Sequence, residues 1–281
     1  MADDVAMTPV SAAAAGVEIA LLLCGIWLVW RLALSPAARA APPSMRLAPW
    51  GISRADFILM VCLAVVGALA AGALAGAIAH WRRLDRDQSL VLGGAALHLG
   101  ILLGLLAFYL GFAPRRAAEP SRAAGALRSG AATFLVTLPI VVGISNGSEY
   151  MLRTLGLPSE KQELVSILEN TDSMALRVAL VIVATLLVPI TEELLFRAGL
   201  FRYLRTRIPR RTALIATALL FGALHVDWTN LGGLASLVPL AVLAVIFSLA
   251  YERTGNIGTT MVAHALFNLN TFILIAAGAG S

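Results

Sequence analysis

The amino-acid sequence predicts an all-α protein, a polytopic transmembrane helical bundle of about eight spans. Hydrophobic residues make up 59% of the 281 residues and charged residues only 13%, which soluble globular domains do not show. Several segments contain about 18 or more mostly apolar residues, enough to cross a bilayer as a helix. The net charge of +5 falls mainly in short loops, which indicates membrane orientation rather than nucleic-acid binding. We therefore expect one integral membrane domain over residues 1–281.

Eight apolar stretches are candidates for the spans. They are Val17–Leu34, Ala55–Ala79, Ser89–Phe112, Leu127–Ile144, Met174–Leu204, Thr212–His225, Leu234–Tyr251 and Gly258–Ala277. The fourth and sixth are short or amphipathic, so seven spans are an alternative. Most Lys and Arg residues follow the first, third, fifth and seventh stretches, which places both termini outside the cytoplasm by the positive-inside rule. The motifs described below all lie in 174–277, which we therefore treat as the catalytic core. We treat 1–144 as N-terminal accessory spans.

The polar connection Glu149–Asp172 is the one long loop between spans. Ser159, followed by Gln162, forms a capping box that predicts a short helix lying on the membrane surface. The dipeptide Asn146-Gly147 predicts a turn just before this connection. In the accessory spans, His98 is a lone polar residue on an apolar helix, and we interpret it as a structural histidine whose hydrogen bonds are satisfied.

The fifth span carries a cluster of charge. Glu192, Glu193 and Arg197 lie inside an otherwise apolar segment. Each charge at the centre of a membrane helix costs about 2.5–3.5 kcal/mol, so the cluster requires partners inside the protein or a function. Glu193 and Arg197 are four residues apart, so they share a helix face and are predicted to pair. Glu192 lies about 100° round the axis, over Phe196, and is predicted to be the free carboxylate.

Two later spans place polar residues at helical spacing. Phe221 and His225 are four apart in the sixth span, and His264 and Asn268 are four apart in the eighth. Counted at about 1.5 Å per residue from the basic turns, Glu192 and His225 lie at a depth of about 21–23 Å. By the same count His264 and Asn268 lie at about 16–23 Å. We therefore expect the four polar side chains to share one layer of the membrane.

Glu, His, His and Asn in one layer predict hydrolysis by activated water. No Ser or Cys occupies a comparable position with a base in reach, which disfavours covalent catalysis. Glu192, assisted by His225, is suited to deprotonate a water that attacks a carbonyl carbon. His264 and Asn268 are donors suited to the resulting oxyanion. The same residue types also fit a Zn²⁺ site held by Glu192, His225 and His264, and residue types alone leave both alternatives open.

The three motifs together resemble those of a known family. Glu-Glu-x-x-x-Arg, Phe-x-x-x-His and His-x-x-x-Asn, in this order on separate spans, are similar to the CPBP family. These CAAX proteases and bacteriocin-processing enzymes are intramembrane glutamate proteases related to the eukaryotic CAAX prenyl endopeptidase. The likeness covers about Leu187–Asn268. One departure is that family members often have Gly directly after the motif Arg, whereas Ala198 precedes Gly199 here.

The resemblance implies an intramembrane endopeptidase that uses no metal or other cofactor. Glu192 would be the general base, and His225 would assist it. His264 and Asn268 would form the oxyanion site. The supporting residues of the three motifs are Glu193, Arg197 and Phe221.

The implied substrate is a peptide or a membrane-associated protein, prenylated or not, and the lipid bilayer surrounds the enzyme. We expect no nucleic-acid partner, and the oligomeric state stays open. Heavy use of Ala, Gly and Arg favours a bacterial source, so we expect the inner membrane of a bacterium. One alternative is a bacteriocin-immunity, binding or regulatory protein of the same family. The other is a transporter or proton relay, although no internal repeat typical of many transporters is visible.

Overall fold

Helices form all the regular structure in the part of the chain that the structure describes. The computed structural model describes residues 8–40, 45–112, 123–157, 167–168, 171–229 and 231–278. The elements are α1 (Pro9–Val29), η1 (Trp30–Leu34), α2 (Pro36–Ala40), α3 (Arg54–Arg82), α4 (Arg86–Gly111), α5 (Ala123–Thr154), α7 (Met174–Ile182), η2 (Val183–Leu187), α8 (Val188–Glu192), η3 (Glu193–Phe201), α9 (Arg202–Arg205), α10 (Arg210–Ala223), η4 (Leu231–Ser236), α11 (Leu237–Thr254) and α12 (Ile257–Ala276). The segments η1, η2 and η3 are π-helical, and η4 is a 3₁₀-helix.

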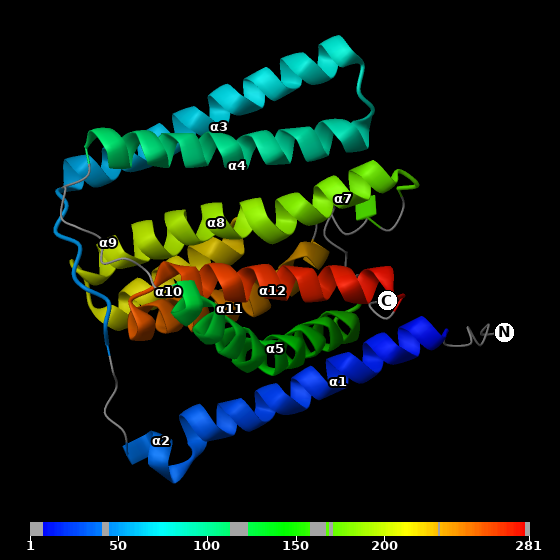
Figure 1. The fold of residues 1–281 in the computed structure, drawn as a ribbon, viewed down its shortest axis with the longest axis vertical. Helices are drawn as coiled ribbons and strands as arrows, with labels where there is room; N and C mark the ends of the chain where they lie inside the picture. The colour runs from blue at the N-terminus through cyan, green and yellow to red at the C-terminus, as the bar shows by residue number, and fades with distance from the viewer. Residues whose placement is uncertain are drawn as a thin grey trace.

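Seven helical stretches of the described residues are long and apolar enough to cross a membrane, as expected for an all-helical membrane bundle. The predicted sixth span is not among them, because α10 has only 14 residues. The chain still passes along the bundle through α10, since α1 begins and α12 ends at the same end (Figure 1). The predicted eight spans therefore correspond to seven long helical passes and one short pass.

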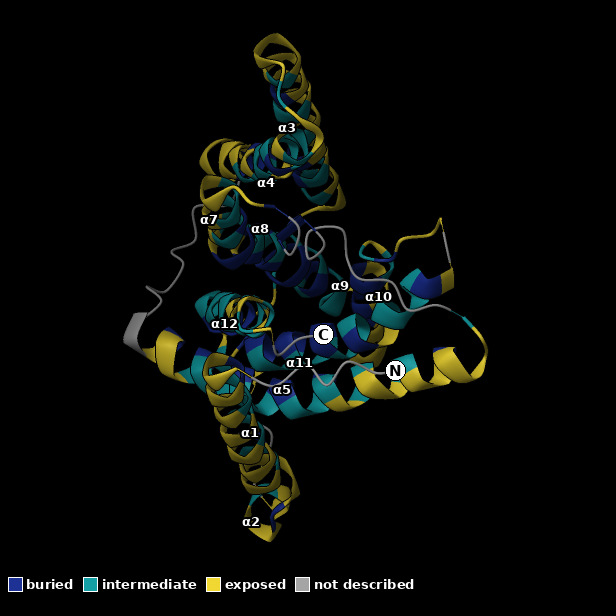
Figure 2. Ribbon diagram, turned by 90° about the vertical axis from the view of Figure 1, so that its right-hand side faces the viewer, coloured by how far each residue is buried: buried dark blue, intermediate teal, exposed yellow. Residues whose placement is uncertain are grey.

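The motif-bearing helices lie in the middle of the bundle. A continuous rod runs from α7 through η2, α8 and η3 to α9. The α3–α4 hairpin packs on one side of this rod, and α10, α11 and α12 pack on the other, followed by α5 and then α1 (Figure 1). The main buried apolar cluster joins η3, α5, α10, α11 and α12 and includes Phe134, Phe196, Phe221, Phe247 and Ala263. By contrast, α1 is mostly exposed (Figure 2).

Glycines allow two pairs of helices to approach closely. A Cβ atom on Gly100 of α4 would lie 2.1 Å from the carbonyl oxygen of Gly67 in α3, so only a glycine fits there. In the same way, a Cβ atom on Gly25 of α1 would lie 2.1 Å from the carbonyl oxygen of Leu135 in α5. Pro139 lacks the N–H group that would otherwise bond to the Leu135 carbonyl. The α1–α5 contact therefore lies where Pro139 leaves one backbone hydrogen bond of α5 unmade.

The prediction of a turn at Asn146-Gly147 is wrong, and the fourth span is longer than predicted. Helix α5 continues through these residues to Thr154. Gly inside a helix costs only about 1 kcal/mol relative to Ala, which packing of α5 against α11 and α12 can offset. The chain leaves the helix at Gly156, whose φ of +70° lies in the left-handed region that favours glycine.

The predicted surface helix lies mostly outside the described residues. Its capping-box residues, Ser159 and Gln162, fall in 158–166, which the structure does not describe. Ile167 and Leu168 are helical and buried, in one apolar cluster with Val91 of α4 and Leu180 of α7. The end of this connection therefore packs against the bundle.

The connecting segment 45–53, which leads into α3, is attached to the basic end of the core. The backbone N–H groups of Arg46 and Leu47 donate to the carbonyl oxygen of Glu252 at 3.0 and 3.1 Å. The guanidinium of Arg202 donates to the Ala48 carbonyl at 3.1 Å, and that of Arg207 donates to the Ile52 carbonyl. These bonds connect the accessory helices to the end of the motif-bearing rod.

A buried carboxylate organises the same end of the core. The Glu252 side chain is 1% exposed and accepts hydrogen bonds from the guanidinium groups of Arg205 and Arg210. The hydrogen bond to Glu252 raises the pKa of Arg210. Glu252 thus neutralises part of the basic turn between α9 and α10 and holds this turn against the last turn of α11.

Candidate active site

Three of the predicted site residues meet at Glu192, the last residue of α8. Oε1 of Glu192 lies 3.3 Å from Nε2 of His225, and Oε2 lies 3.9 Å from Nε2 of His264. The Glu192 side chain is 12% exposed, and Oε2 is buried without a hydrogen-bond partner among the described residues. The structure therefore brings together one carboxylate and two imidazoles from three separate helical passes, as the depth argument predicted.

Two π-helical segments flank α8, and one of them explains the position of Asn268. In η2 the N–H of Val188 donates to the carbonyl oxygen of Val183, five residues back. The next donor in this π pattern would be residue 189, but Pro189 has no N–H group. The carbonyl oxygen of Ala184 is thus left without a helical partner, and Nδ2 of Asn268 donates to it at 2.7 Å. One of the two amide N–H groups of Asn268 is committed to the backbone, which spacing in the sequence did not indicate.

The second π segment, η3, carries the predicted ion pair. Nη1 of Arg197 lies 3.0 Å from Oε1 of Glu193, and both side chains are almost fully buried. The same Oε1 atom is 3.0 Å from Nδ1 of His264. Nε and Nη2 of Arg197 have no hydrogen-bond partner among the described residues. Instead, the guanidinium lies over the rings of Phe221 and Phe247, with Cζ 4.4 and 5.5 Å from the ring centroids.

Phe221 connects the ion pair to the second histidine. Its ring centroid lies 4.5 Å from that of His225 and 5.1 Å from that of Phe196. His225 lies two residues beyond the end of α10, in a turn. Its Nδ1 atom is 2.7 Å from the carbonyl oxygen of Phe221, which keeps the ring next to the helix it follows. Phe221 therefore contacts both the guanidinium of Arg197 and the imidazole of His225.

The hydrogen bonds decide where the histidine protons lie. Carbonyl oxygens and ionised carboxylates only accept hydrogen bonds. Nδ1 of His225, facing a backbone carbonyl, therefore carries a proton, and so does Nδ1 of His264, facing Glu193. In a neutral imidazole the other nitrogen, Nε2, is then an acceptor. Because Nε2 of each ring faces Glu192, a hydrogen bond there requires one further proton.

This proton count makes the site electrically neutral. The 3.3 Å contact between Glu192 and His225 needs a shared proton, whereas the 3.9 Å separation from His264 does not. With that proton, the His225–Glu192 pair has no net charge, and the negative charge of Glu193 is balanced by the Arg197 guanidinium. Neutrality is what apolar surroundings favour, since an uncompensated buried charge is strongly destabilising.

No group of three or more His, Cys, Asp or Glu side chains among the described residues is arranged to hold a metal ion. This includes Glu192, His225 and His264, the set considered for Zn²⁺ from the sequence. The contacts of Nδ1 in both histidines orient their rings toward Glu192, whether the water is activated by Glu192 alone or by a bound metal ion.

The interpretation of His98 as a satisfied structural histidine is wrong. Its Nδ1 atom is buried and has no hydrogen-bond partner among the residues that the structure describes. The helix that carries it, α4, packs against α7, η2 and α8. The apolar surroundings in the sequence gave no indication that this side chain lies beside the motif-bearing rod.

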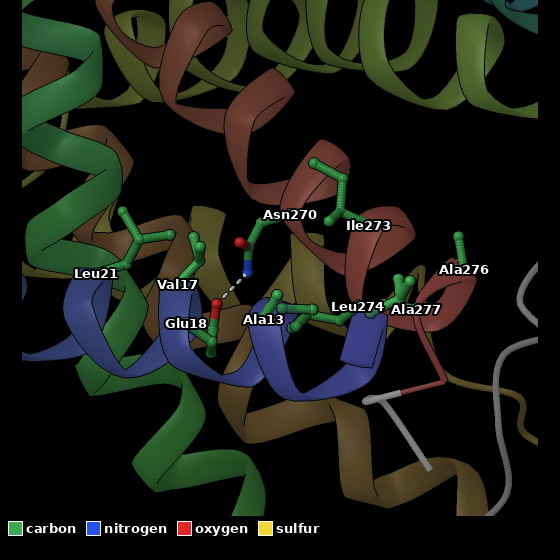
Figure 3. A pocket seen from close by; sticks show the side chains of 11 residues that line it. Ala13, Val17, Glu18, Leu21, Asn270, Ile273, Leu274, Ala276 and Ala277 are labelled. Atoms are coloured by element: carbon green, nitrogen blue, oxygen red, sulfur yellow. Dashed lines mark hydrogen bonds between the residues drawn. The ribbon is translucent and has the colours of Figure 1, made fainter. Parts of the chain in front are cut away.

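Sequence reasoning also missed a polar contact between the first and last passes. Oε2 of Glu18 in α1 accepts a hydrogen bond of 3.0 Å from Nδ2 of Asn270 in α12 (Figure 3). The pair lines a pocket of about 510 Å³ that is otherwise apolar, including Val17, Leu21 and Ile273. None of the predicted site residues lines this pocket, so it is separate from the candidate active site. A carboxylate inside the first apolar stretch was the available signal.

The segment that carries the three motifs matches a known family. Residues 174–270 match the family model described as Type II CAAX prenyl endopeptidase Rce1-like. YdiL of Bacillus subtilis (strain 168), a curated protein described as a candidate membrane peptidase, is 29% identical over 133 residues. These are 47% of this chain and 49% of that protein, so the chain spans about half the length of the relative. No solved structure matches the chain.

Proposed function

We propose that the protein is an intramembrane endopeptidase that hydrolyses peptide bonds with glutamate-activated water, because residues 174–270 match the Rce1-like CAAX prenyl endopeptidase model. One observation carries this proposal. Oε2 of Glu192 is buried, has no partner among the described residues, and lies 3.9 Å from Nε2 of His264. A water molecule can donate to both acceptors, which is the position a nucleophile needs.

The first step is attack by this water. Glu192 Oε2 accepts the proton as the water oxygen bonds to the carbonyl carbon of the scissile peptide. The proton is then shared with Nε2 of His264, whose ring becomes positively charged as the negative oxyanion forms. Glu193 stabilises that charge through Nδ1 at 3.0 Å. The site and the oxyanion together remain neutral throughout the step.

The second step is collapse of the tetrahedral intermediate. The carbon–nitrogen bond breaks, and the leaving nitrogen takes a proton from Glu192 or from Nε2 of His225. The hydroxyl proton of the intermediate then passes through Glu192 to the same nitrogen, so the products are a carboxylate and an ammonium group, and the site returns to its resting proton count. His264 and the remaining N–H group of Asn268 are the proposed oxyanion donors. Glu193, Arg197 and Phe221 are positioning residues.

The proposed substrate is a peptide or a membrane-associated protein whose cleavage site reaches the depth of Glu192 in the bilayer. The helical passes rich in exposed apolar residues support residence in a membrane. We propose the inner membrane of a bacterium. Whether the substrate carries a prenyl group is a separate question, answered by comparing prenylated and unmodified peptides of the same sequence.

The test is cleavage of a peptide library by the purified full chain in detergent. Glu192→Gln removes the base without changing the shape of the side chain and is expected to lower kcat by about 10²–10⁴-fold. Glu149→Gln, on the exposed end of α5, is the matched control and is expected to cleave like wild type. If Glu192→Gln cuts the same peptides at the wild-type rate, the proposal fails, and a binding or immunity role takes its place.

A further inference from the structure

His98 is the one histidine of the inner bundle that the proposed mechanism does not use. It lies on α4, outside the family match at 174–270. Its Nδ1 atom is buried without a partner among the described residues, while Nδ1 of His225 and of His264 each faces an acceptor. A buried ring nitrogen without a partner inside a membrane bundle costs free energy without stabilising the fold, so a function is the expected reason for its presence.

The location of His98 connects it to the active site. It shares a face of α4 with Ile101, three residues further on, and Ile101 packs in one apolar cluster with Leu194 of η3, two residues after Glu192. Helix α4 contacts η2 and α8, and α8 ends at Glu192. His98 is therefore part of the same layer of polar side chains, contributed by the accessory helices rather than by the matched core.

Nδ1 of His98 has no protein partner in the part of the chain that the structure describes. None of the described residues accepts from or donates to Nδ1, and no metal-holding group of side chains includes His98. No acceptor-only neighbour fixes its tautomer, in contrast to the other two histidines. A neutral imidazole in this state has one N–H donor available for a group that arrives from outside.

The proposed reaction lacks a donor that is ready before proton transfer. His264 gains its Nε2 proton only as the water is deprotonated, and Asn268 has already committed one N–H group to Ala184. Donors that are oriented in advance toward the developing oxyanion contribute most to catalysis. The carbonyl oxygen of the substrate must also point away from the Glu192 carboxylate, because two acceptors repel each other.

We propose that His98 is a further catalytic residue, which donates a hydrogen bond from its neutral imidazole to the carbonyl oxygen of the scissile peptide. The accessory hairpin α3–α4 then completes the oxyanion site from the side opposite α12. This inference rests on the proposed endopeptidase function. It adds a residue outside the three motifs to the catalytic set.

The test compares His98→Leu and His98→Gln with wild type, using one cleaved peptide and the full chain in detergent. Removal of the donor in His98→Leu is expected to lower kcat by about 10²-fold with little change in KM. The amide N–H of His98→Gln is expected to restore at least part of kcat. His80→Leu, at the exposed end of α3, is the matched control and should behave like wild type.

The outcomes separate this inference from the proposed function. If Glu192→Gln is inactive but His98→Leu has wild-type kcat, the His98 inference is wrong and the endopeptidase proposal stands. If Glu192→Gln is fully active, the endopeptidase proposal itself is wrong. Thermal unfolding is measured for each variant. A His98→Gln variant that unfolds like wild type yet is as slow as His98→Leu would overturn the role as a hydrogen-bond donor.

Discussion

His264 Nδ1 lies 3.0 Å from Oε1 of Glu193, the oxygen that also binds the guanidinium of Arg197. This contact joins the first and third motifs through a group that is not the proposed base. The second carboxylate of the Glu-Glu pair therefore does more than neutralise an arginine. It fixes the tautomer of a histidine, and in the proposed mechanism it would stabilise the positive charge on that ring.

The Glu193–Arg197 pair is predicted to be required as a pair for stability. Glu193→Gln leaves a fully buried guanidinium without its counter-charge, which is expected to destabilise the protein by about 3–5 kcal/mol. The double variant Glu193→Gln/Arg197→Met removes both charges and should unfold at a temperature closer to wild type. It should nevertheless stay slow in cleavage, because the amide at position 193 has no negative charge to stabilise a protonated His264 ring. Equal loss of stability in the single and double variants would contradict this account.

Pro189 is predicted to set the position of Asn268. Pro189→Ala supplies an N–H group that can continue the π pattern by bonding to the Ala184 carbonyl, five residues back, and so compete with Asn268 for that oxygen. We expect a lower kcat without a fall in the unfolding temperature, since the new backbone bond compensates for the lost side-chain bond. Pro239→Ala, in the first turn of α11, is the control, because proline there removes an N–H group that needs no helical partner. A Pro189→Ala variant with wild-type kcat would show that Asn268 does not depend on this carbonyl.

Phe221 is predicted to stabilise the buried guanidinium. Phe221→Leu removes the ring that lies 4.4 Å from Cζ of Arg197 and is expected to cost about 2 kcal/mol or more, as for a desolvated cation–π contact. The unfolding temperature should fall, and kcat should fall as well because the ring also contacts His225. Phe112→Leu, at an exposed position after α4, should change neither quantity.

Removal of metal ions is predicted to leave cleavage unchanged. The proposed base is a carboxylate whose water is activated by proton transfer alone, so treatment of the purified protein with a strong chelator should not alter kcat. The comparison is made on the same peptide before and after chelation, and again after Zn²⁺ is returned. Loss of activity on chelation with recovery on adding Zn²⁺ would assign Glu192, His225 and His264 as ligands instead.

The meeting of Glu192, His225 and His264 could be predicted from the sequence because it depends on regular quantities. Helical spacing determines which residues share a face, and the length of each pass determines its depth. The pairing of Glu193 with Arg197 follows from the same spacing. The all-helical membrane fold follows from apolar segments of sufficient length, although α10 proved too short to count as a full pass.

The remaining features depend on where helices depart from regularity or contact distant passes. The π segments on either side of α8 displace the backbone partners that spacing assumes, and Pro189 was the visible sign of this in the sequence. The contact of His264 with Glu193 requires two helices to approach at a particular rotation. The position of His98 beside the site requires the packing of α4 on α8. None of these is encoded in the periodicity of one helix.

The shortness of α10 has a consequence for how water reaches a reaction inside the bilayer. Fourteen helical residues rise about 21 Å, less than the hydrocarbon core of about 30 Å. The chain leaves the helix at His225 and continues through exposed Asp227 and Thr229, whose backbone must be hydrated or buried in protein. We therefore expect hydrated backbone to reach the level of Glu192 and His225 at this point. We expect the hydrolytic water to enter there, so that the reactant comes from one side of the membrane only.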